Sequence, residues 1–171
     1  CGRGNLSFTS INLPRIGIEA HGDVKKFYAI LDGRIDLVIR QLLHRFKIQC
    51  SKKVYNYPFL MGQGVWLGSD RLKWTDSVAE VLKHGTLSVG FIGLAEALKA
   101  LTGKHHGESE ASQKLGLGII GHMRKRMDDE SAKTGLNFTL LATPAEGLSG
   151  RFVKIDKKKY GVIPGVTDRE Y

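Results

Sequence analysis

The sequence predicts an α/β protein with parallel strands, and three observations support this class. Three short apolar and β-branched segments, at about residues 5–13, 86–92 and 136–143, have the composition of strands. Two long segments with apolar residues every three or four positions separate them, which is the period of amphipathic helices. The chain has 171 residues, 42% of them hydrophobic and 25% charged, as expected of a globular domain. Strands that alternate with long helices are typical of parallel sheets.

The first predicted strand, Asn5–Leu13, carries hydroxyl and amide side chains along one side and ends at Pro14. A long helix is predicted over Asp23–Ile48, because apolar residues recur there at spacings of three and four. The stripe is wide enough that we expect much of the helix surface to be covered. Gly33 is its weak position, since glycine costs a helix up to about 1 kcal/mol relative to alanine. The stripe consists of Val24, Phe27, Leu31, Ile35, Val38, Leu42 and Phe46, with Tyr28, Ile39 and Leu43 beside it.

The middle of the chain begins with an irregular stretch, NYPFLMGQGVWLGSD. Ser77 and Glu80 have the spacing of a capping box and predict a short helix that stops at Gly85. The strand Thr86–Ile92 follows, and Gly93 begins the helix GLAEALKALTG. A second long helix is predicted from about Ser109 to Lys133. Its predicted apolar face is Ala111, Leu115, Ile119, Met123 and Met127.

The third predicted strand, LNFTLLAT, runs directly into the turn TPAEGLSG and a short helix or turn. Pro144 suits the first turn of a helix, and Thr143 before it can serve as the N-cap. The backbone N–H groups of Ala145, Glu146 and Gly147 would then favour an anion, helped by the helix dipole. The alternative is an ordinary capped turn, and the spacing alone does not decide between them. The pattern GxxxxGK[ST] is absent from the chain, so this is not a P-loop.

The formal net charge of +9 indicates a polyanionic partner, such as a nucleotide, a nucleic acid or an acidic protein surface. The basic residues are scattered and no aromatic stripe accompanies them, so we expect no direct nucleic-acid binding. No apolar run approaches the roughly 20 residues that cross a bilayer, and we expect no membrane association. Cys1 and Cys50 form neither a disulfide framework nor a CxxC motif, which indicates a reducing cytoplasm. Lys52 and Lys53 could lower the pKa of Cys50, although a lone cysteine is more often a packing residue.

The segment that contains His105, His106 and Glu108 resembles a set of metal ligands at first sight. The i, i+4 histidine spacing of HExxH is missing and neither cysteine is nearby in the sequence, so no metal site is expected. The alternative is a polar loop that caps the following helix. Polar contact between this segment and a bound ligand stays open.

Five segments of the chain resemble the anaerobic (class III) ribonucleoside-triphosphate reductases, which are glycyl-radical enzymes. They are GRGNLSFTSINLPRI, PFLMGQ, KHGTLSVGFIGLAEAL, LTGKHHGES and LNFTLLATPAEGLSGRF. The resemblance runs in order over essentially the whole chain. It implies part of a ten-stranded α/β barrel of the ribonucleotide reductase and glycyl-radical enzyme type, with the long helices outside. We therefore expect residues 1–171 to be a partial catalytic barrel domain, a fragment of a longer chain.

The resemblance also implies a reaction. The family reduces the 2′-carbon of a ribonucleoside triphosphate, which supplies deoxyribonucleotides for DNA replication in the cytoplasm. A glycyl radical, installed by a radical-SAM activating enzyme, generates a cysteine thiyl radical that abstracts the 3′-hydrogen of the substrate. The reductant is formate or a thioredoxin-type dithiol, nucleotides act as allosteric effectors, and the full-length protein is expected to be a homodimer.

The radical residues of the family are expected to lie outside this chain. Cys1 directly precedes GRGN, whereas the resemblance places the radical cysteine a couple of dozen positions earlier. The radical glycine and the cysteine-rich zinc site near the family's C-terminus are likewise expected elsewhere. The isolated chain is therefore expected to have no reductase activity.

The resemblance assigns roles to particular residues. TPAEGLSG resembles the loop that holds the substrate phosphates, and Asn5 lies near the position of a polar group at the ribose hydroxyls. The expected phosphate-binding residues are Thr143, Ala145, Glu146, Gly147, Leu148 and Ser149. Possible pocket residues are Ser7 and Ser10 in one cavity, and His105, His106 and Glu108. Two other classes stay open: a non-catalytic nucleotide- or phosphate-binding α/β module, and a basic nucleic-acid-binding protein.

Overall fold

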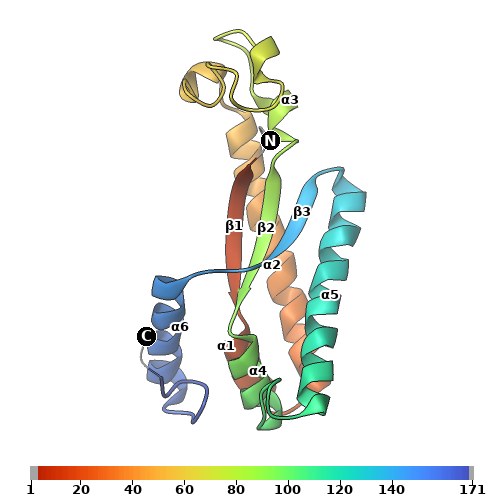
Figure 1. The fold of residues 1–171 in the computed structure, drawn as a ribbon, viewed down its shortest axis with the longest axis vertical. Coiled ribbons are helices and arrows are strands. Elements are labelled where there is room, and N and C mark those ends of the chain that lie inside the picture. The colour runs from red at the N-terminus through yellow and green to blue at the C-terminus, as the bar shows by residue number, and fades with distance from the viewer. Residues whose placement is uncertain (1–3, 170–171) are drawn as a thin grey trace. The chain divides into compact units, whose positions relative to one another are not determined.

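The sheet has three strands and agrees with the predicted class. A computed structural model describes residues 4–169. The strands β1 (Asn5–Asn12), β2 (Thr86–Ile92) and β3 (Asn137–Ala142) pair in the order β1-β2-β3 and run parallel (Figure 1). The helices are α1 (Leu13–Ala20), α2 (Val24–Cys50), α3 (Ala79–Leu82), α4 (Leu94–Thr102), α5 (Glu110–Thr134) and α6 (Glu146–Tyr160), with 3-10 turns at Val54–Asn56 and Ser69–Arg71. All three strands and both long helices predicted from the sequence are confirmed.

The chain divides into two compact units. The first unit contains the residues up to Thr9, Leu37–Val89 and Arg126–Thr139. The second unit contains Ser10–Asp36, Gly90–Lys125 and the residues from Leu140 onward. The strands and the helices α2 and α5 each contribute residues to both units.

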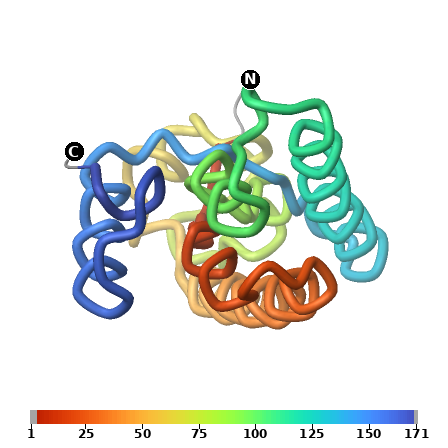
Figure 2. Tube along the Cα trace, turned by 90° about the horizontal axis from the view of Figure 1, so that it is seen from below, coloured from red at the N-terminus to blue at the C-terminus, as the bar shows by residue number. Residues whose placement is uncertain are grey.

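In the second unit, α1 and α4 pack closely (Figure 2). A glycine of α1, Gly17, allows this close approach. A Cβ atom added to Gly17 would lie 2.7 Å from the carbonyl oxygen of Ala97 and 3.2 Å from the Cβ of Ala100. Leu13 and Ile16 of α1 and Leu98 of α4 are almost fully buried. This contact between small residues lets α1, which follows β1, pack directly against α4, which follows β2.

The helix α2 has one buried face rather than the broad coverage that the sequence predicted. Phe27, Leu31 and Ile35 are fully buried, as the periodicity predicts. Leu37 and Ile48, which lie off the stripe, are about half exposed. Gly33 also lies on the exposed side, where no described atom outside its own helix and chain neighbours comes within 4 Å of an added Cβ.

The buried face of α5 differs from the prediction at its first turn. Ala111 is exposed, whereas Ile119, Met123 and Met127 are fully buried. Residues at a constant spacing of four drift around a helix that has 3.6 residues per turn. The buried face instead mixes spacings of three and four, and it consists of Ser112, Gly116, Ile119, Met123 and Met127.

Residues 53–78 form an irregular excursion in the first unit, around a small apolar core that includes Val54, Met61, Trp66 and Val81. The indole N–H of Trp66 donates to the carbonyl oxygen of Val81 at 2.8 Å. No membrane-crossing helix is present in the part of the chain that the structure describes.

The predicted capping box of the short helix is wrong. The helix α3 starts only at Ala79, with Val78 as the cap residue. Ser77 Oγ accepts a hydrogen bond from the Ala79 N–H, while Glu80 pairs with Lys83 instead of reaching back to Ser77.

Replacing Gly17 with alanine is expected to lower the free energy of unfolding by about 1–3 kcal/mol, because backbone atoms cannot move aside cheaply for an added methyl group. Chemical denaturation measures the change. The matched control is Gly33→Ala, which fills open space and is expected to raise stability by up to about 1 kcal/mol. Equal stabilities of the two variants would contradict the close approach of α1 and α4.

Candidate functional site

The second unit has an open cavity where β2 and β3 end. Its volume is about 600 Å³. Its lining consists of Ile92 at the end of β2, and Thr143, Ala145, Glu146, Gly147 and Ser149 between β3 and the first turn of α6. Five of the six residues predicted to bind phosphate therefore line one cavity, and the sixth, Leu148, lies between Gly147 and Ser149 in the first turn of α6.

The N-terminus of α6 lies at this cavity. The first N–H groups of a helix have no carbonyl partner inside it, so those of Glu146, Gly147 and Leu148 are available to a ligand. Glu146 and Gly147 are exposed. The helix has 15 residues, longer than the short helix or turn predicted, and its dipole favours negative charge at this end.

The predicted N-cap of this helix is wrong. Ala145 occupies the cap position and no side chain caps the helix. Thr143 Oγ1 instead lies 2.7 Å from Ser10 Oγ, so the two hydroxyls share a hydrogen bond. Ser149 Oγ donates to the carbonyl oxygen of Glu146 at 2.7 Å. Because a hydroxyl has one proton, Ser149 must rotate before it can donate to a phosphate.

Gly90 of β2 makes room for the hydroxyl pair. A Cβ atom on Gly90 would lie 2.7 Å from Ser10 Oγ and closer still to Thr143 Oγ1. Because Gly90 has no side chain, the hydroxyls of Ser10 on β1 and Thr143 after β3 can reach each other across the middle strand. The Thr143 N–H also donates to the carbonyl oxygen of Phe91, which extends the sheet up to the turn.

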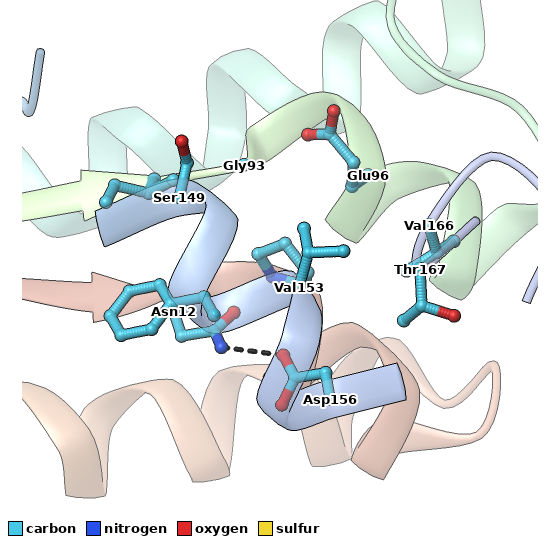
Figure 3. A pocket seen from close by; sticks show the side chains of 11 residues that line it. Asn12, Gly93, Glu96, Ser149, Val153, Asp156, Val166 and Thr167 are labelled. Atoms are coloured by element: carbon cyan, nitrogen blue, oxygen red, sulfur yellow. Dashed lines mark hydrogen bonds between the residues drawn. The ribbon is translucent and has the colours of Figure 1, made fainter. Parts of the chain in front are cut away.

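A second, smaller cavity of about 220 Å³ shares Ile92 and Ser149 with the first. Asn12, Asp156 and Thr167 supply polar groups to it, and Phe152 contributes to its apolar wall. The Asn12 side chain donates to Asp156 across this cavity (Figure 3). Neither Asn12 nor Asp156 stands out in the sequence by motif or spacing.

The polar residues of β1 point to both sides of the strand, not to one. Ser7 and Thr9 lie on the side of α2, where Arg45 donates to both hydroxyls. Ser10 lies at an alternate position and points to the opposite side, because successive strand residues alternate. The side chains of Ser7 and Ser10 therefore point to opposite sides of β1. Asn5 is two residues before Ser7 and therefore lies on the same side of the strand, and it is exposed.

The segment with the two histidines forms a hydrogen-bonded turn before α5. The His105 N–H donates to Glu108 at 2.7 Å, and Lys99 forms an ion pair with the same carboxylate at 2.9 Å. The hydrogen bond from His105 and the charge of Lys99 lower the pKa of Glu108. Ser109 Oγ accepts from the Ser112 N–H, so the predicted polar cap of the following helix is confirmed. Among the described residues, no cluster of three His, Cys, Asp or Glu side chains could hold a metal ion.

Cys50 has the packing role that is the more common one for a lone cysteine. It packs against the apolar core of the first unit, and burial raises the pKa of its thiol, so the alternative in which Lys52 and Lys53 lower that pKa is not what the structure shows. Cys1 lies outside the described residues.

Comparison with known proteins gives the family. The family model "Anaerobic ribonucleoside-triphosphate reductase" matches residues 1–171. The chain belongs to this family. It is 39% identical over 173 residues to the anaerobic ribonucleoside-triphosphate reductase of Salmonella typhimurium, covering 99% of this chain and 24% of that protein. It is 33% identical to that of Enterobacteria phage T4, covering 98% of this chain and 27% of the phage protein. The chain thus spans about a quarter of the length of these reductases.

Solved structures agree at the level of the fold. An anaerobic ribonucleotide reductase from Thermotoga maritima with citrate in its active site has a TM-score of 0.70 at 20% identity, covering 94% of this chain and 28% of that chain. The complex of the same enzyme with dATP and CTP has a TM-score of 0.70 at 19% identity, covering 94% of this chain and 25% of that chain. The expected fold, part of the α/β barrel of anaerobic ribonucleotide reductases, is confirmed.

Replacing Gly90 with alanine is expected to separate the Ser10 and Thr143 hydroxyls and to lower the free energy of unfolding by about 1–3 kcal/mol. Urea denaturation measures the loss. Gly121→Ala on α5 is the matched control, since no described atom outside its own helix and chain neighbours approaches a Cβ there within 4 Å. Equal stabilities of the Gly90→Ala and Gly121→Ala variants would contradict the tight packing over Gly90.

Alkylation of Cys50 is expected to be slow near neutral pH, because burial raises the pKa of the thiol and leaves less of the reactive thiolate. The rate of iodoacetamide modification, followed by mass spectrometry of the peptide that contains Cys50, should rise only at a higher pH than in the denatured protein. Equal pH profiles in the native and denatured protein would be the contrary result.

Proposed function

We propose that this chain forms part of the catalytic barrel of an anaerobic ribonucleoside-triphosphate reductase, in which the first turn of α6 binds the phosphates of the substrate. One observation carries the proposal. In a chain of this family, the N-terminus of a 15-residue helix borders an open cavity at the ends of two parallel strands. Ligands of parallel α/β folds bind at the carboxyl ends of the strands.

The chemistry of the turn suits a polyphosphate. The N–H groups of Glu146, Gly147 and Leu148 would donate to phosphate oxygens, and the helix dipole would favour their negative charge. Glu146 is the one acidic residue of this turn, and its exposed side chain can turn into solvent. Gly147 has open space around its Cα, so a phosphate can approach the backbone there.

The magnitudes limit what the turn can do alone. A hydrogen bond to a charged group contributes about 1.5–3 kcal/mol, whereas a micromolar dissociation constant corresponds to about 8 kcal/mol. Three such bonds reach this order, but association also costs at least about 4 kcal/mol of lost translational and rotational freedom. Contacts to the ribose and the base must therefore supply the remaining affinity. His105, His106 and Glu108 are our candidates for polar contacts of this kind, and the ribose role of Asn5 stays a proposal that follows from the family resemblance alone.

No described residue of this chain fits the role of the radical-bearing group. Cys50 packs in the apolar core of the first unit and is not part of the cavity lining. We therefore assign these residues to substrate binding and derive no radical step from them. The glycyl radical, its radical-SAM activating enzyme, the zinc site, the formate or dithiol reductant and homodimer formation stay proposals that follow from family membership.

Replacing Gly147 with valine in the full-length protein is expected to raise the Kd for a ribonucleoside triphosphate by about tenfold or more, equivalent to about 1.4 kcal/mol. The branched side chain would occupy the space above the N–H groups, while the backbone would be undisturbed because no described neighbour approaches that space. Isothermal titration measures the Kd, and amide hydrogen exchange over residues 143–152 locates the bound phosphates.

The matched control is Gly121→Val, which makes the same change on an open position of α5. It is expected to leave triphosphate affinity and exchange at the turn unchanged. If the Gly147→Val variant bound the ribonucleoside triphosphate with unchanged affinity, the proposed phosphate role of this turn would be wrong. Binding to single-stranded RNA that weakens steeply with salt would instead favour a nucleic-acid partner.

A further inference from the structure

The helix α6 is held in place by a charged residue rather than by an apolar face. Within α6, all of whose residues the structure describes, Asp156 is the one residue that is buried, at 2% exposure. Phe152 and Val153 are only half-buried, and Ile155 is 43% exposed. Within the part of the protein that this chain spans, the polar contacts of Asp156 therefore attach α6 more closely than apolar packing does.

Asp156 contacts the junction between β1 and α1. Asn12 Nδ2 donates to one carboxylate oxygen at 2.7 Å (Figure 3). Arg15 Nε donates to the other carboxylate oxygen at 2.7 Å. Arg15 Nη2 also pairs with the second oxygen. Asn12 is itself fixed, because its Oδ1 accepts the Arg15 N–H as the N-cap of α1. One carboxylate thus joins α6 to the end of a strand and the start of another helix.

A buried ion pair adds little net stability, because removing charges from water offsets their attraction. What it does fix is geometry, since each donor accepts only a narrow range of distances and angles. Here the donors are two planar groups, an amide and a guanidinium, which constrain both the rotation of α6 about its axis and its position along that axis.

We propose that Asp156 is a positioning residue that aims the first turn of α6 at the phosphates of the substrate. This inference rests on the phosphate role of that turn. Asp156 follows Glu146 by ten residues, which is roughly 15 Å of helix at 1.5 Å per residue. A helix transmits a rotation or a shift over this length to its N–H groups. Small displacements matter at such sites, since a misplacement of about 1 Å can cost about a hundredfold in rate.

Two other contacts keep α6 attached when Asp156 is changed, which makes the role testable. Before the helix, Thr143 shares its hydrogen bond with Ser10. At the far end, Tyr160 donates to Glu19, and Lys159 lies 3.6 Å from the same carboxylate. Although burial opposes its ionisation, the hydrogen bond from Tyr160 and the charge of Lys159 lower the pKa of Glu19, so it is ionised at neutral pH. Loss of the Asp156 contacts should therefore misalign the helix without releasing it.

The test is an exchange of the amide and the carboxylate in the full-length protein. Asp156→Asn leaves Arg15 without its carboxylate, and Asn12→Asp places two carboxylates face to face. The double variant restores one carboxylate and one amide beside Arg15, and aspartate still caps α1. For each variant, titration calorimetry gives the Kd for a ribonucleoside triphosphate and for the ribonucleoside without phosphates. Hydrogen exchange over residues 143–152 reports on the turn.

We expect each single variant to raise the triphosphate Kd by about tenfold to a hundredfold, with little change for the nucleoside. The double variant should return to within about threefold of the parent, because a recovery within about 0.7 kcal/mol is what a restored pair implies. Arg15→Lys, which keeps the charge but loses the planar fork, is a milder variant should Asp156→Asn fail to fold. It should raise the triphosphate Kd in the same direction. Tyr160→Phe is the control at the other end of α6.

The outcomes separate this inference from the function on which it rests. If Gly147→Val leaves triphosphate affinity unchanged, the phosphate role itself fails. If Gly147→Val weakens binding while Asp156→Asn and Arg15→Lys do not, only the positioning role is overturned. A fall in unfolding temperature with an unchanged ratio of triphosphate to nucleoside affinity would assign Asp156 to stability alone, and would also overturn the proposal.

Discussion

The side-chain amide of Asn12 is the contact on which the arrangement of the second unit depends. Its oxygen caps the N-terminus of α1 by accepting a hydrogen bond from the Arg15 N–H, and its nitrogen donates a hydrogen bond to Asp156 of α6. The last residue of a strand therefore sets the start of the next helix and the position of a helix more than 130 residues later in the sequence. Because both ends of one small planar group are engaged, neither helix can rotate without breaking a hydrogen bond.

The alternation of β1 divides its polar residues between two tasks. Ser7 and Thr9 bond to Arg45 of α2, and this helix covers one side of the strand. Ser10 and Asn12, at the alternate positions, bond to Thr143 before α6 and to Asp156 within α6. A strand with polar residues at both odd and even positions is stable here because each side meets a defined partner, which leaves few buried polar groups unsatisfied.

The sequence predicted the strands, the long helices and the position of the turn before α6, but not the contacts that hold this helix. Periodicity located the strands and long helices, since apolar spacing is a local property of the chain. Periodicity wrongly placed Ala111 on the buried face of α5, because residues at a constant spacing of four drift around a helix. The local pattern of Thr143 before Pro144 wrongly predicted an N-cap, because the actual partner of Thr143, Ser10, is distant in the sequence. Asp156 went unnoticed for the same reason: a charged residue between lysines looks like a solvated one until the strand that binds it is known.

The polar attachment of α6 has a thermal consequence. The hydration of charged groups becomes less favourable on heating, so the penalty for burying the carboxylate of Asp156 beside Arg15 falls as temperature rises. Apolar contacts gain no comparable advantage, because their stabilisation per unit area levels off. The cost of burying the polar attachment of α6 should therefore be smaller at higher temperature.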